Sequence, residues 1–401
     1  MKGRNIWVLS AFSDPRPEAQ SDRYRFICDR LHQEGARVCQ FISRFHHGSK
    51  ETRVPPPTPW RCVTVFEPGY RSNVSLGRIL SHACFDGLIG LYFMREWLRG
   101  GRPTTILTAL PHNGAGLVAC LVAKLTGARM VVDIHDTWPE SLLGVTRIRA
   151  WQRPLFRAWK ALADAAIRMA DFVFAESKRY AERADQVRCP LGLSPAQTVY
   201  LGGDLAYYKV IPPLAERPPL LEKTTFLVAY VGTLGVNYDL DTLLEAFAGF
   251  QAAHPEAGLM LLGGGEREGA LRARIQELGL RAWVSGRIPH NRLIGYLKHC
   301  QVGVNGFKAG GNVAYSYKLN DYWLSGIPVA NSLPGEVAEF VSNNALGYNY
   351  PSEDSESLRR CLEKCHSHWH REPHWKGRIL IFAEQLLDRQ QIYKIILKAC
   401  L

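Results

Sequence analysis

The sequence predicts an α/β protein with two doubly wound domains, and three observations support this. Short apolar stretches alternate with amphipathic, helix-like stretches, which is typical of parallel sheets covered by helices. The alternation stops at an irregular, proline-rich segment, residues 190–219, and then starts again. At 401 residues the chain is long enough for two domains that each bury a core. We expect the carboxyl ends of both sheets to face a central cleft, where such sheets bind ligands.

The first half of the chain shows the alternation from its beginning. A helix is expected at 21–35, where Ser21 or Asp22 can cap the first turn and Gly35 can end the last one. A long helical region from about 150 to 185 is also expected, with the apolar stretch DFVFAES inside it. The other expected elements are the strands NIWVLSAF (5–12), ARVCQFIS (36–43), TTILTAL (104–110) and ARMVVDIHD (128–136), and the helix GAGLVACLVAKLTG (114–127).

The second half repeats the alternation, so both domains are expected to be Rossmann-like. The amphipathic pattern at 376–398 predicts a last helix that crosses the junction between the domains. We therefore expect a first domain at 1–197, a second at 198–375 and the crossover helix at 376–401. The expected strands are FLVAYVGTL (226–234), AGLMLLGGG (257–265), AWVSGRI (282–288), QVGVNGF (301–307) and PVANSL (328–333), and the expected helices are 240–254, 267–280, 290–300 and 318–326.

The composition is that of a globular protein in water, with 46% hydrophobic and 21% charged residues. The most apolar region, 104–125, is interrupted by polar side chains, and no run reaches the roughly 18 apolar residues of a membrane span. The apolar stretch near the N-terminus is too short for a signal peptide, so we expect a cytoplasmic protein. The ten cysteines include no CxxC pair and are expected to be reduced thiols.

The positive charge is concentrated in the first half. Residues 1–200 contain 28 Lys and Arg against 17 Asp and Glu, a formal charge of +11, whereas the whole chain carries +12. Two segments there, 78–102 and 147–171, combine basic and aromatic residues, as helices on an anionic membrane surface do. The alternative is two ordinary helices whose aromatic residues face the core. The sequence contains no recognised nucleic-acid-binding motif, so nucleic acid is not an expected partner.

Three glycine-rich turns, at 232–235, 263–266 and 310–312, follow strands of the second half. Glycine lets the backbone approach a ligand closely, and amides at a helix start favour an anion, so these turns predict a nucleotide-sized pocket. Lys318 can contact a phosphate there, and Asp321 can accept hydrogen bonds from ribose hydroxyls. The alternative is a solvated lysine and an aspartate that only caps a local turn.

These motifs resemble the retaining glycosyltransferases with two Rossmann-like domains, the GT-B architecture. The second half is similar to the C-terminal domain of glycosyltransferase family 4, and the first half resembles a bacterial surface-polysaccharide subgroup of that family. The resemblance covers most of the chain in the right order. The similar runs are GYRSNVSLGRILSHACF, VVDIHDTWPES, YVGTLGVNYDLDTLLEAF, LMLLGGGE, SGRIPHNRLIGYLKHCQVGVNGF and YKLNDYWLSGIPVANS.

The resemblance implies that a nucleotide-sugar donor binds to the second domain. It places His135 at the donor sugar or reacting centre, with Asp136 beside it as a second catalytic candidate. Alternatively, these two residues only cap and orient the following Trp138-Pro139 turn. The donor-binding residues that the resemblance implies are Gly232, Thr233, Gly263, Gly264, Gly265, Glu266, Arg287, Ile288, Lys318 and Asp321.

The sequence departs from the family pattern in three charged groups, one of which is a lysine expected a few residues after the loop glycine and replaced around Tyr238-Asp239. Val313 stands eight residues before the expected ribose ligand, where the family has the first glutamate of an E-x7-E pair. Thr233 stands where an arginine often follows the loop glycine. Lys318 is therefore the expected cation for the diphosphate, with Lys308 and Arg287 in reserve.

No metal and no cofactor other than the donor substrate are expected. Fixed cations and helix-start amides can stabilise a leaving diphosphate without a metal ion. The run Asp239-Leu240-Asp241 has the letters of a D-x-D motif, but we interpret it as a helix start.

Together these features predict a hexosyl- or N-acetylhexosaminyltransferase. It would move a sugar from a nucleotide-diphosphate sugar, by default UDP-linked, to a lipid-linked saccharide or a polysaccharide in bacterial surface polysaccharide biosynthesis. The basic first half predicts a peripheral location at the inner face of the cytoplasmic membrane. The alternatives are a nucleotide-sugar epimerase of the same build, which needs no acceptor, and a non-catalytic partner subunit of a transferase.

Overall fold

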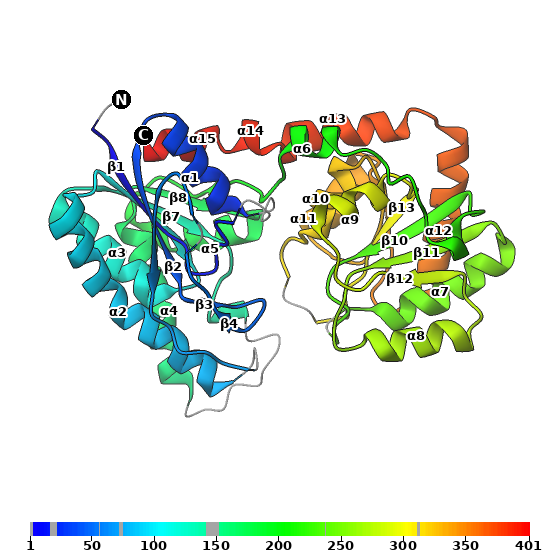
Figure 1. The fold of residues 1–401 in the computed structure, drawn as a ribbon, viewed down its shortest axis with the longest axis horizontal. Coiled ribbons are helices and arrows are strands. Elements are labelled where there is room, and N and C mark those ends of the chain that lie inside the picture. The colour runs from blue at the N-terminus through cyan, green and yellow to red at the C-terminus, as the bar shows by residue number, and fades with distance from the viewer. Residues whose placement is uncertain are drawn as a thin grey trace. The chain divides into compact units, whose positions relative to one another are not determined.

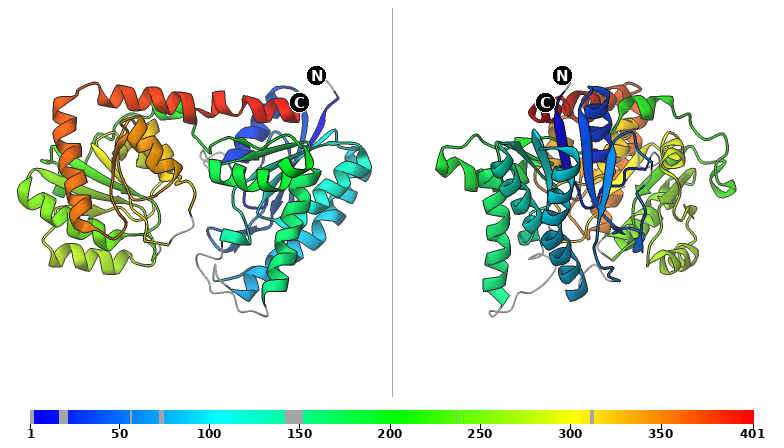
Figure 2. Two further views of the ribbon diagram at one scale, coloured as in Figure 1. Left: turned by 180° about the vertical axis from the view of Figure 1, so that it is seen from behind. Right: turned by 60° about the vertical axis from the view of Figure 1, so that its left-hand side comes forward.

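The computed structural model describes residues 3–16, 22–55, 57–71, 75–141, 152–236, 238–310 and 313–401. The chain forms two compact units (Figure 1). Unit 1 comprises residues 1–200 and 393–401, and unit 2 comprises residues 201–392. Each unit contains a parallel sheet covered by helices (Figure 2). The prediction of two Rossmann-like, doubly wound α/β halves is confirmed.

The sheet of unit 1 is built from seven parallel strands. They are β1 (Asn5–Leu9), β2 (Arg37–Ser43), β5 (Arg61–Val65), β6 (Thr105–Leu110), β7 (Arg129–Ile134), β8 (Phe172–Ala175) and β9 (Gln197–Thr198), beside a small hairpin of β3 (Phe45–His46) and β4 (Glu51–Thr52). Their order is β5-β2-β1-β6-β7-β8-β9. Trp7 of the central β1 lies in register with Cys39 and Ile106, and its ring packs on Phe41 and Phe93. This aromatic group forms the centre of the core.

Short polar side chains begin several helices of unit 1. The helices are α1 (Arg23–Gln33), α2 (Leu76–Gly100), α3 (Asn113–Thr126), α4 (Arg153–Met169), α5 (Lys178–Arg188) and α15 (Lys394–Cys400). Asp22 caps α1 by accepting a hydrogen bond from the Arg25 amide at 2.7 Å, as the sequence predicted. Ser75 and Ser177 cap α2 and α5 in the same way.

The C-terminal residues belong to unit 1. Thr105 Oγ1 donates a hydrogen bond to the Cys400 carbonyl at 2.9 Å, and Arg129 Nη1 donates one to the Ala399 carbonyl at 3.0 Å. The guanidinium of Arg23 lies 4.6 Å from the centre of the Tyr393 ring. Residues 393–401 therefore contribute directly to the core of the N-terminal unit.

Unit 2 has a six-stranded parallel sheet in the order β12-β11-β10-β13-β14-β15. The strands are β10 (Phe226–Val231), β11 (Ala257–Leu262), β12 (Ala282–Val284), β13 (Val302–Asn305), β14 (Val329–Asn331) and β15 (Gly347–Asn349). The helices are α6 (Leu205–Val210), α7 (Leu240–Ala253), α8 (Glu268–Glu277), α9 (His290–Leu297), α10 (Lys318–Leu324), α11 (Glu336–Asn343), α12 (Ser355–Arg371), α13 (Trp375–Leu387) and α14 (Arg389–Ile392). Every residue of β10 and β11 is buried, as expected for strands covered on both faces.

The expected strands are all present, and the main differences concern helices. The long helical region at 150–185 is two helices separated by β8, which pairs in parallel with β7. The last helix, expected at 376–398, is interrupted at Asp388 and Tyr393 and forms α13, α14 and α15. The strands β3, β4, β5, β9 and β15 and the helices α6, α11 and α12 were not predicted.

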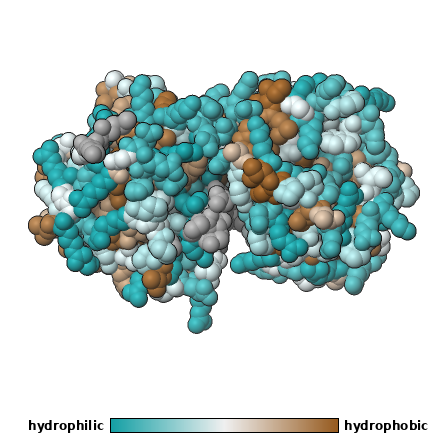
Figure 3. All heavy atoms as spheres, turned by 45° about the horizontal axis from the view of Figure 1, so that its top comes forward, coloured by the Kyte–Doolittle hydropathy of each residue, from teal (hydrophilic) through white to brown (hydrophobic). Residues whose placement is uncertain are grey.

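The surface and the thiols agree with the composition. In the described ranges, no helix is both long and apolar enough to cross a bilayer. The ten cysteines are all free thiols. The face in Figure 3 is largely hydrophilic, with hydrophobic residues in separate patches.

Candidate functional site

The strand order of unit 2 reverses between β10 and β13. Open α/β sheets bind ligands at the carboxyl ends of the strands beside such a switch point. Gly232 directly follows β10, and Gly263 directly follows β11, its neighbour in the sheet. Phe307 comes shortly after β13, on the other side of β10. Two of the predicted glycine turns therefore lie where a ligand of this sheet is expected.

Lys318 holds its ammonium group among aromatic rings at this edge. The residue is only 7% exposed. Its Nζ lies 3.6 Å from the ring centre of Tyr238, 4.8 Å from that of Phe307 and 5.2 Å from that of Tyr230. Among the residues that the structure describes, none pairs with Nζ through a carboxylate or a hydrogen bond, and burial lowers the pKa of Lys318 from 10.5 to about 7. The site therefore contains a buried cationic group that lacks a counter-ion.

The position of Lys318 is fixed by the packing of α10. Tyr322, one turn later, is fully buried; its hydroxyl accepts a hydrogen bond from the Val231 amide at 2.9 Å and donates one to the Val304 carbonyl at 3.1 Å. These bonds attach the helix to both strands of the switch point. The lysine stem packs on Gly232, where an added Cβ would lie 3.0 Å from Lys318 Cε. A side chain at Gly232 would therefore push on the lysine.

The two glycine turns contact each other through their backbones. Gly263 has a φ of +153°, and an added Cβ would lie 1.9 Å from the Gly232 carbonyl oxygen. At Gly265 an added Cβ would lie 2.4 Å from the Leu234 carbonyl oxygen, and the Leu234 amide donates a hydrogen bond to the Gly264 carbonyl at 3.1 Å. Only glycine fits at these approaches, so the turns form one continuous backbone surface.

The other predicted donor residues lie around these turns. Thr233 and Glu266 are exposed. Arg287 and Ile288 follow β12, and the Arg287 side chain lies over Gly264, where an added Cβ would be 3.1 Å from Arg287 Cγ. The structure thus brings the ends of β11 and β12 together. The roles of these residues toward a donor stay predictions.

Asp321 already has two hydrogen-bond partners. Its Oδ1 accepts from the Tyr208 hydroxyl at 2.5 Å and pairs with His290 Nε2 at 2.8 Å. Burial alone would lower the pKa of His290, but the charge of Asp321 and this hydrogen bond raise it above its usual 6.5. Both bonds use the same carboxylate oxygen. Ribose binding by Asp321 stays a prediction.

The two aspartates with D-x-D spacing serve separate local partners. Asp239 occupies the N-cap position of α7, is 3% exposed and accepts a hydrogen bond from the Glu353 amide at 2.8 Å. Asp241 pairs with Arg267 at 2.6 Å. The interpretation of this run as a helix start agrees with the structure.

In unit 1, His135 follows β7 and lies between two carboxylates. Its Nε2 is 3.1 Å from Asp133 Oδ2, and its Nδ1 is 3.0 Å from Glu176 Oε2. Burial alone would lower the pKa of His135, but the charges and hydrogen bonds of both carboxylates raise it to about 9. Both ring nitrogens are engaged. The imidazolium can therefore stabilise negative charge nearby, whereas bonding a sugar hydroxyl would require it to release one carboxylate.

Asp133 is itself held by a buried ion pair. Arg23 Nε and Nη2 bond its two oxygens at 2.8 and 3.0 Å, and the Tyr24 hydroxyl donates to Oδ2 at 2.9 Å. Arg23 is 2% exposed and Asp133 is fully buried. Burial would raise the pKa of Asp133, but Arg23 and His135 hold it well below its usual range. This network fixes the His135 ring in one orientation.

Asp136 acts on its own turn. Its carboxylate accepts hydrogen bonds from the Thr137 amide at 2.8 Å and from the Trp138 indole at 2.6 Å. Burial raises the pKa of Asp136 above its usual 3.8. These contacts match the alternative in which Asp136 orients the Trp138 turn, and a catalytic role for it stays a prediction.

A cluster of rings at the switch point of unit 1 was not predicted. Phe12 and His112 follow β1 and β6, and their ring centres are 4.9 Å apart. His82 of α2 stacks on His112 at 4.4 Å and on Trp138 at 5.3 Å. Burial and the neighbouring His112 lower the pKa of His82 to about 2, so this histidine is neutral. The sequence signal was a histidine after a strand, at His112, which resembles the position of His135.

Some predicted positions fall outside the described residues. They are residues 311 and 312 of the third glycine turn and residues 147–151 of the second basic segment. Lys308 is partly buried beyond β13. Val313, where the family has a glutamate, brings no charge to the site.

Two family models match the chain and together cover most of it. Residues 20–202 match the glycosyl transferase 4-like domain, and residues 214–373 match glycosyl transferases group 1. Among curated proteins, none matches significantly.

Solved structures resemble the chain over nearly its whole length. Sucrose-phosphate synthase from Thermosynechococcus elongatus has a TM-score of 0.68 at 18% identity and covers 98% of this chain and 97% of its own. Alr3699/HepE from Anabaena, in complex with UDP-glucose, has a TM-score of 0.65 at 16% identity, with 98% of both chains covered. The lipopolysaccharide outer core galactosyltransferase WaaB has a TM-score of 0.61 at 17% identity, covering 98% and 99%. These likenesses show the GT-B fold.

Proposed function

The chain belongs to the GT-B glycosyltransferases that join a 4-like domain to a group 1 domain, and from this premise we propose a retaining transferase of bacterial surface polysaccharide biosynthesis. It moves a hexose or N-acetylhexosamine from a nucleotide-diphosphate sugar to a lipid-linked saccharide or a polysaccharide. UDP is the proposed nucleotide. The likeness to a structure in complex with UDP-glucose and to a lipopolysaccharide galactosyltransferase supports this choice.

The observation that carries the proposal is the lysine at the switch point of unit 2. Removing an ammonium group from water without a counter-ion is costly, and natural proteins keep such groups mainly at functional sites. The Lys318 ammonium is 3.6 Å from the centre of the Tyr238 ring and packs beside the Gly232 turn. A diphosphate in this turn would supply the missing negative charge.

The proposed reaction is the front-face displacement that the resemblance to retaining glycosyltransferases implies. An acceptor hydroxyl oxygen attacks the anomeric carbon on the face from which the diphosphate leaves. The bond from the anomeric carbon to the phosphate oxygen breaks, its electron pair stays on the diphosphate, and the acceptor proton passes to a phosphate oxygen. Lys318 stabilises the charge that grows on the leaving group, and this stabilisation is stronger where water is excluded. The positive charge of His135 is proposed to shield the negative charge that develops as the diphosphate leaves the sugar.

A lipid-linked acceptor is supported by the outer face of α2. Its exposed side chains recur every three or four residues and are apolar along the whole helix, and Arg95 and Arg99 are exposed beside them. Phe85 and Phe93, by contrast, face the core. An apolar helix face bordered by arginines suits an anionic lipid surface. The large exposed apolar residues are Leu76, Ile79, Leu80, Leu91, Met94 and Leu98, which are between 50% and 81% exposed.

The test is thermal unfolding with UDP, GDP, ADP and TDP. A nucleotide at about 100 times its Kd should stabilise the native state by about 2.7 kcal/mol. Lys318→Met removes the charge but keeps an unbranched side chain in the aromatic cage. Lys364→Met is the matched control. Lys364 Nζ also lies over an aromatic ring, 5.6 Å from the ring centre of Tyr348, but this lysine is on the exposed surface of α12.

We expect a shift with UDP in the wild type and in the control, but not in Lys318→Met. No shift with any nucleotide would contradict the donor site and favour a non-catalytic partner subunit. A second assay combines the UDP-sugar with bacterial membrane lipids. A new glycolipid whose anomeric configuration matches that of the donor supports the proposal, whereas an epimer formed from the donor alone identifies an epimerase.

A further inference from the structure

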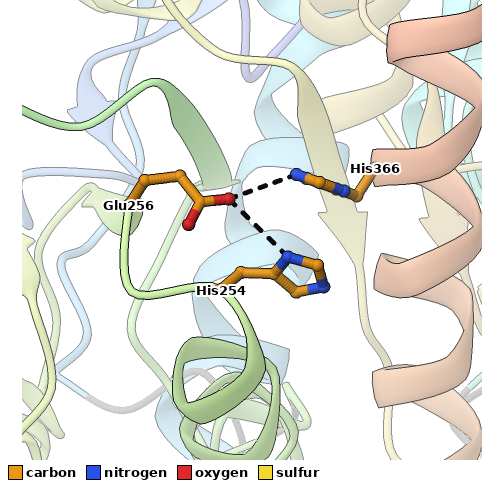
Figure 4. Close-up of side chains that lie close together, drawn as sticks. All are labelled: His254, Glu256 and His366. Carbon is orange, nitrogen blue, oxygen red and sulfur yellow. Dashed lines mark ion pairs between the residues drawn. The ribbon is translucent and has the colours of Figure 1, made fainter.

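A histidine–carboxylate cluster lies at the amino-terminal edge of the unit 2 sheet, opposite the edge that holds the glycine turns. His254 and Glu256 lie in the turn between α7 and β11, and His366 projects toward them from α12 (Figure 4). Glu256 Oε1 is 3.6 Å from His254 Nδ1 and 3.3 Å from His366 Nε2. All three ligand-type atoms lie within 4.8 Å of one another. Three side chains that commonly bind transition metals therefore converge on one point.

One ring nitrogen of each histidine faces Glu256. His254 Nε2 is 2.8 Å from Glu363 Oε2, so we assign its proton to Nε2, from which it is donated to that carboxylate. The other ring nitrogen, Nδ1, faces Glu256. His366 Nε2 is buried, and it pairs with Glu256 Oε1 at 3.3 Å.

We propose that His254, Glu256 and His366 bind one Zn²⁺ ion. Zinc takes nitrogen and carboxylate oxygen ligands at about 2.0–2.2 Å in a tetrahedron, which places ligand atoms about 3.3 Å apart. The two distances to Glu256 are already within a few tenths of an ångström of this value. Zinc-binding histidines usually donate their second ring N–H to a carboxylate, and Glu363 occupies that position for His254.

Aromatic side chains cover part of the cluster. The His366 ring centre is 4.8 Å from that of Phe226, and the His254 ring is 4.6 Å from that of Phe250, so apolar side chains shield one side of the cluster. His370, one turn further along α12, has its ring 4.6 Å from that of His366. It or a water molecule can occupy the fourth position.

The role of this ion is structural. It joins α12 to the turn that begins β11, and it lies at the opposite edge of the sheet from Lys318. The inference is therefore independent of the proposed donor site. Nucleotide binding should not require zinc, and zinc binding should not require Lys318.

The test is metal binding by the full chain without a histidine tag. After treatment with EDTA and dialysis, calorimetric titration should give one Zn²⁺ per chain, and zinc should raise the Tm. Co²⁺ in the same site should show the visible absorption of a four-coordinate ion. Glu256→Gln keeps the side-chain shape and should weaken Zn²⁺ binding at least about 100-fold, and Glu363→Gln should weaken it about 10–100-fold.

His374→Ala is the matched control, because His374 is an exposed histidine of the same unit outside the cluster. It should bind zinc like the wild type. His366→Ala should lose the site, and its circular dichroism spectrum shows whether it has folded; if it has not, Glu256→Gln decides the question. An unchanged affinity in Glu256→Gln would assign the ion to other histidines and overturn the proposal. A wild-type chain that binds no zinc would overturn it as well.

Discussion

Binding of a nucleotide sugar should be coupled to proton uptake by Lys318. Burial lowers the pKa of this lysine from 10.5 to about 7 in the unliganded protein, because no anion compensates for the lost water. A bound diphosphate places negative charge beside the ammonium and raises the pKa again. At a pH between the pKa of Lys318 in the free protein and its pKa in the complex, the complex holds a proton that the free protein has lost. Affinity should therefore be highest below pH 7 and fall as the pH rises above it.

The size of the effect follows from the free-state pKa. At pH 7 about half of the lysines are neutral, so binding should take up about 0.5 proton per ligand. At pH 9 only about one in a hundred is charged, so Kd should rise roughly 100-fold relative to pH 6, provided that the pKa in the complex exceeds 9. The depressed pKa also destabilises the unliganded fold below pH 7 by up to about 5 kcal/mol, and this penalty is relieved as the pH rises toward 10.5.

The assay is calorimetric titration with UDP-glucose, whose phosphates do not titrate in this range. Heats measured in buffers of different ionisation enthalpy give the number of protons taken up. Lys318→Arg should bind without pH dependence because its charge is permanent. Lys318→Met should bind weakly and stabilise the unliganded protein. A flat Kd between pH 6 and 9, with no buffer dependence of the heat, would refute the reasoning.

Three further predictions concern the fold and the membrane. Arg23→Met should destabilise unit 1 by about 3–5 kcal/mol in denaturant titrations, because the buried Asp133 carboxylate loses its two-bond partner and keeps only His135 and Tyr24 among the described residues. Gly263→Ala should lower the free energy of unfolding by at least about 2 kcal/mol, since the added Cβ would lie 1.9 Å from a carbonyl oxygen. In the control Gly269→Ala, on α8, the added Cβ has no neighbour within 4 Å, so this variant should raise the free energy of unfolding by up to about 1 kcal/mol. Leu91→Glu combined with Leu98→Glu should abolish flotation with phosphatidylserine vesicles.

Each of these predictions has a clear contrary result. An unchanged denaturation midpoint in Arg23→Met would mean that the buried pair contributes nothing. Equal costs for the two glycine variants would contradict the steric argument. For the membrane, Leu220→Glu is the control, because Leu220 is 55% exposed in unit 2 and away from α2. Flotation by the double glutamate variant at the level of this control would reject α2 as the docking face.

The fold was predictable where burial leaves a simple pattern. The runs around Trp7 and Tyr230 are apolar throughout because their strands are covered on both faces. β15 was not predicted because the strand is only three residues long, Gly347–Asn349, and these residues are partly exposed. α12 had a readable signal, since Leu358, Cys361, Leu362 and Cys365 are buried at helical spacing. The histidines and charged residues between them masked it.

The candidate site was predictable only where neighbours in sequence form it. The glycine turns directly follow strands, and Lys318 is the first residue of a helix. Spacing and residue type were therefore sufficient to propose a phosphate site. The stacking of His82 on His112 joins residues thirty positions apart on different elements, which no local pattern encodes. The two carboxylates around His135 come from β7 and from the residue after β8. Their convergence depends on the parallel pairing of those strands.

The contribution of residues 393–401 to unit 1 has a consequence for biosynthesis. The ribosome makes these residues after all of unit 2, so the N-terminal unit cannot complete its core when its own first 200 residues have emerged. Domains usually fold in order during translation. Here unit 2 can finish first, while unit 1 waits for Tyr393 to cover Arg23 and for Cys400 to accept its hydrogen bond from Thr105. A fragment cut at residue 200 should therefore need the last helix, supplied as a peptide, to recover its stability.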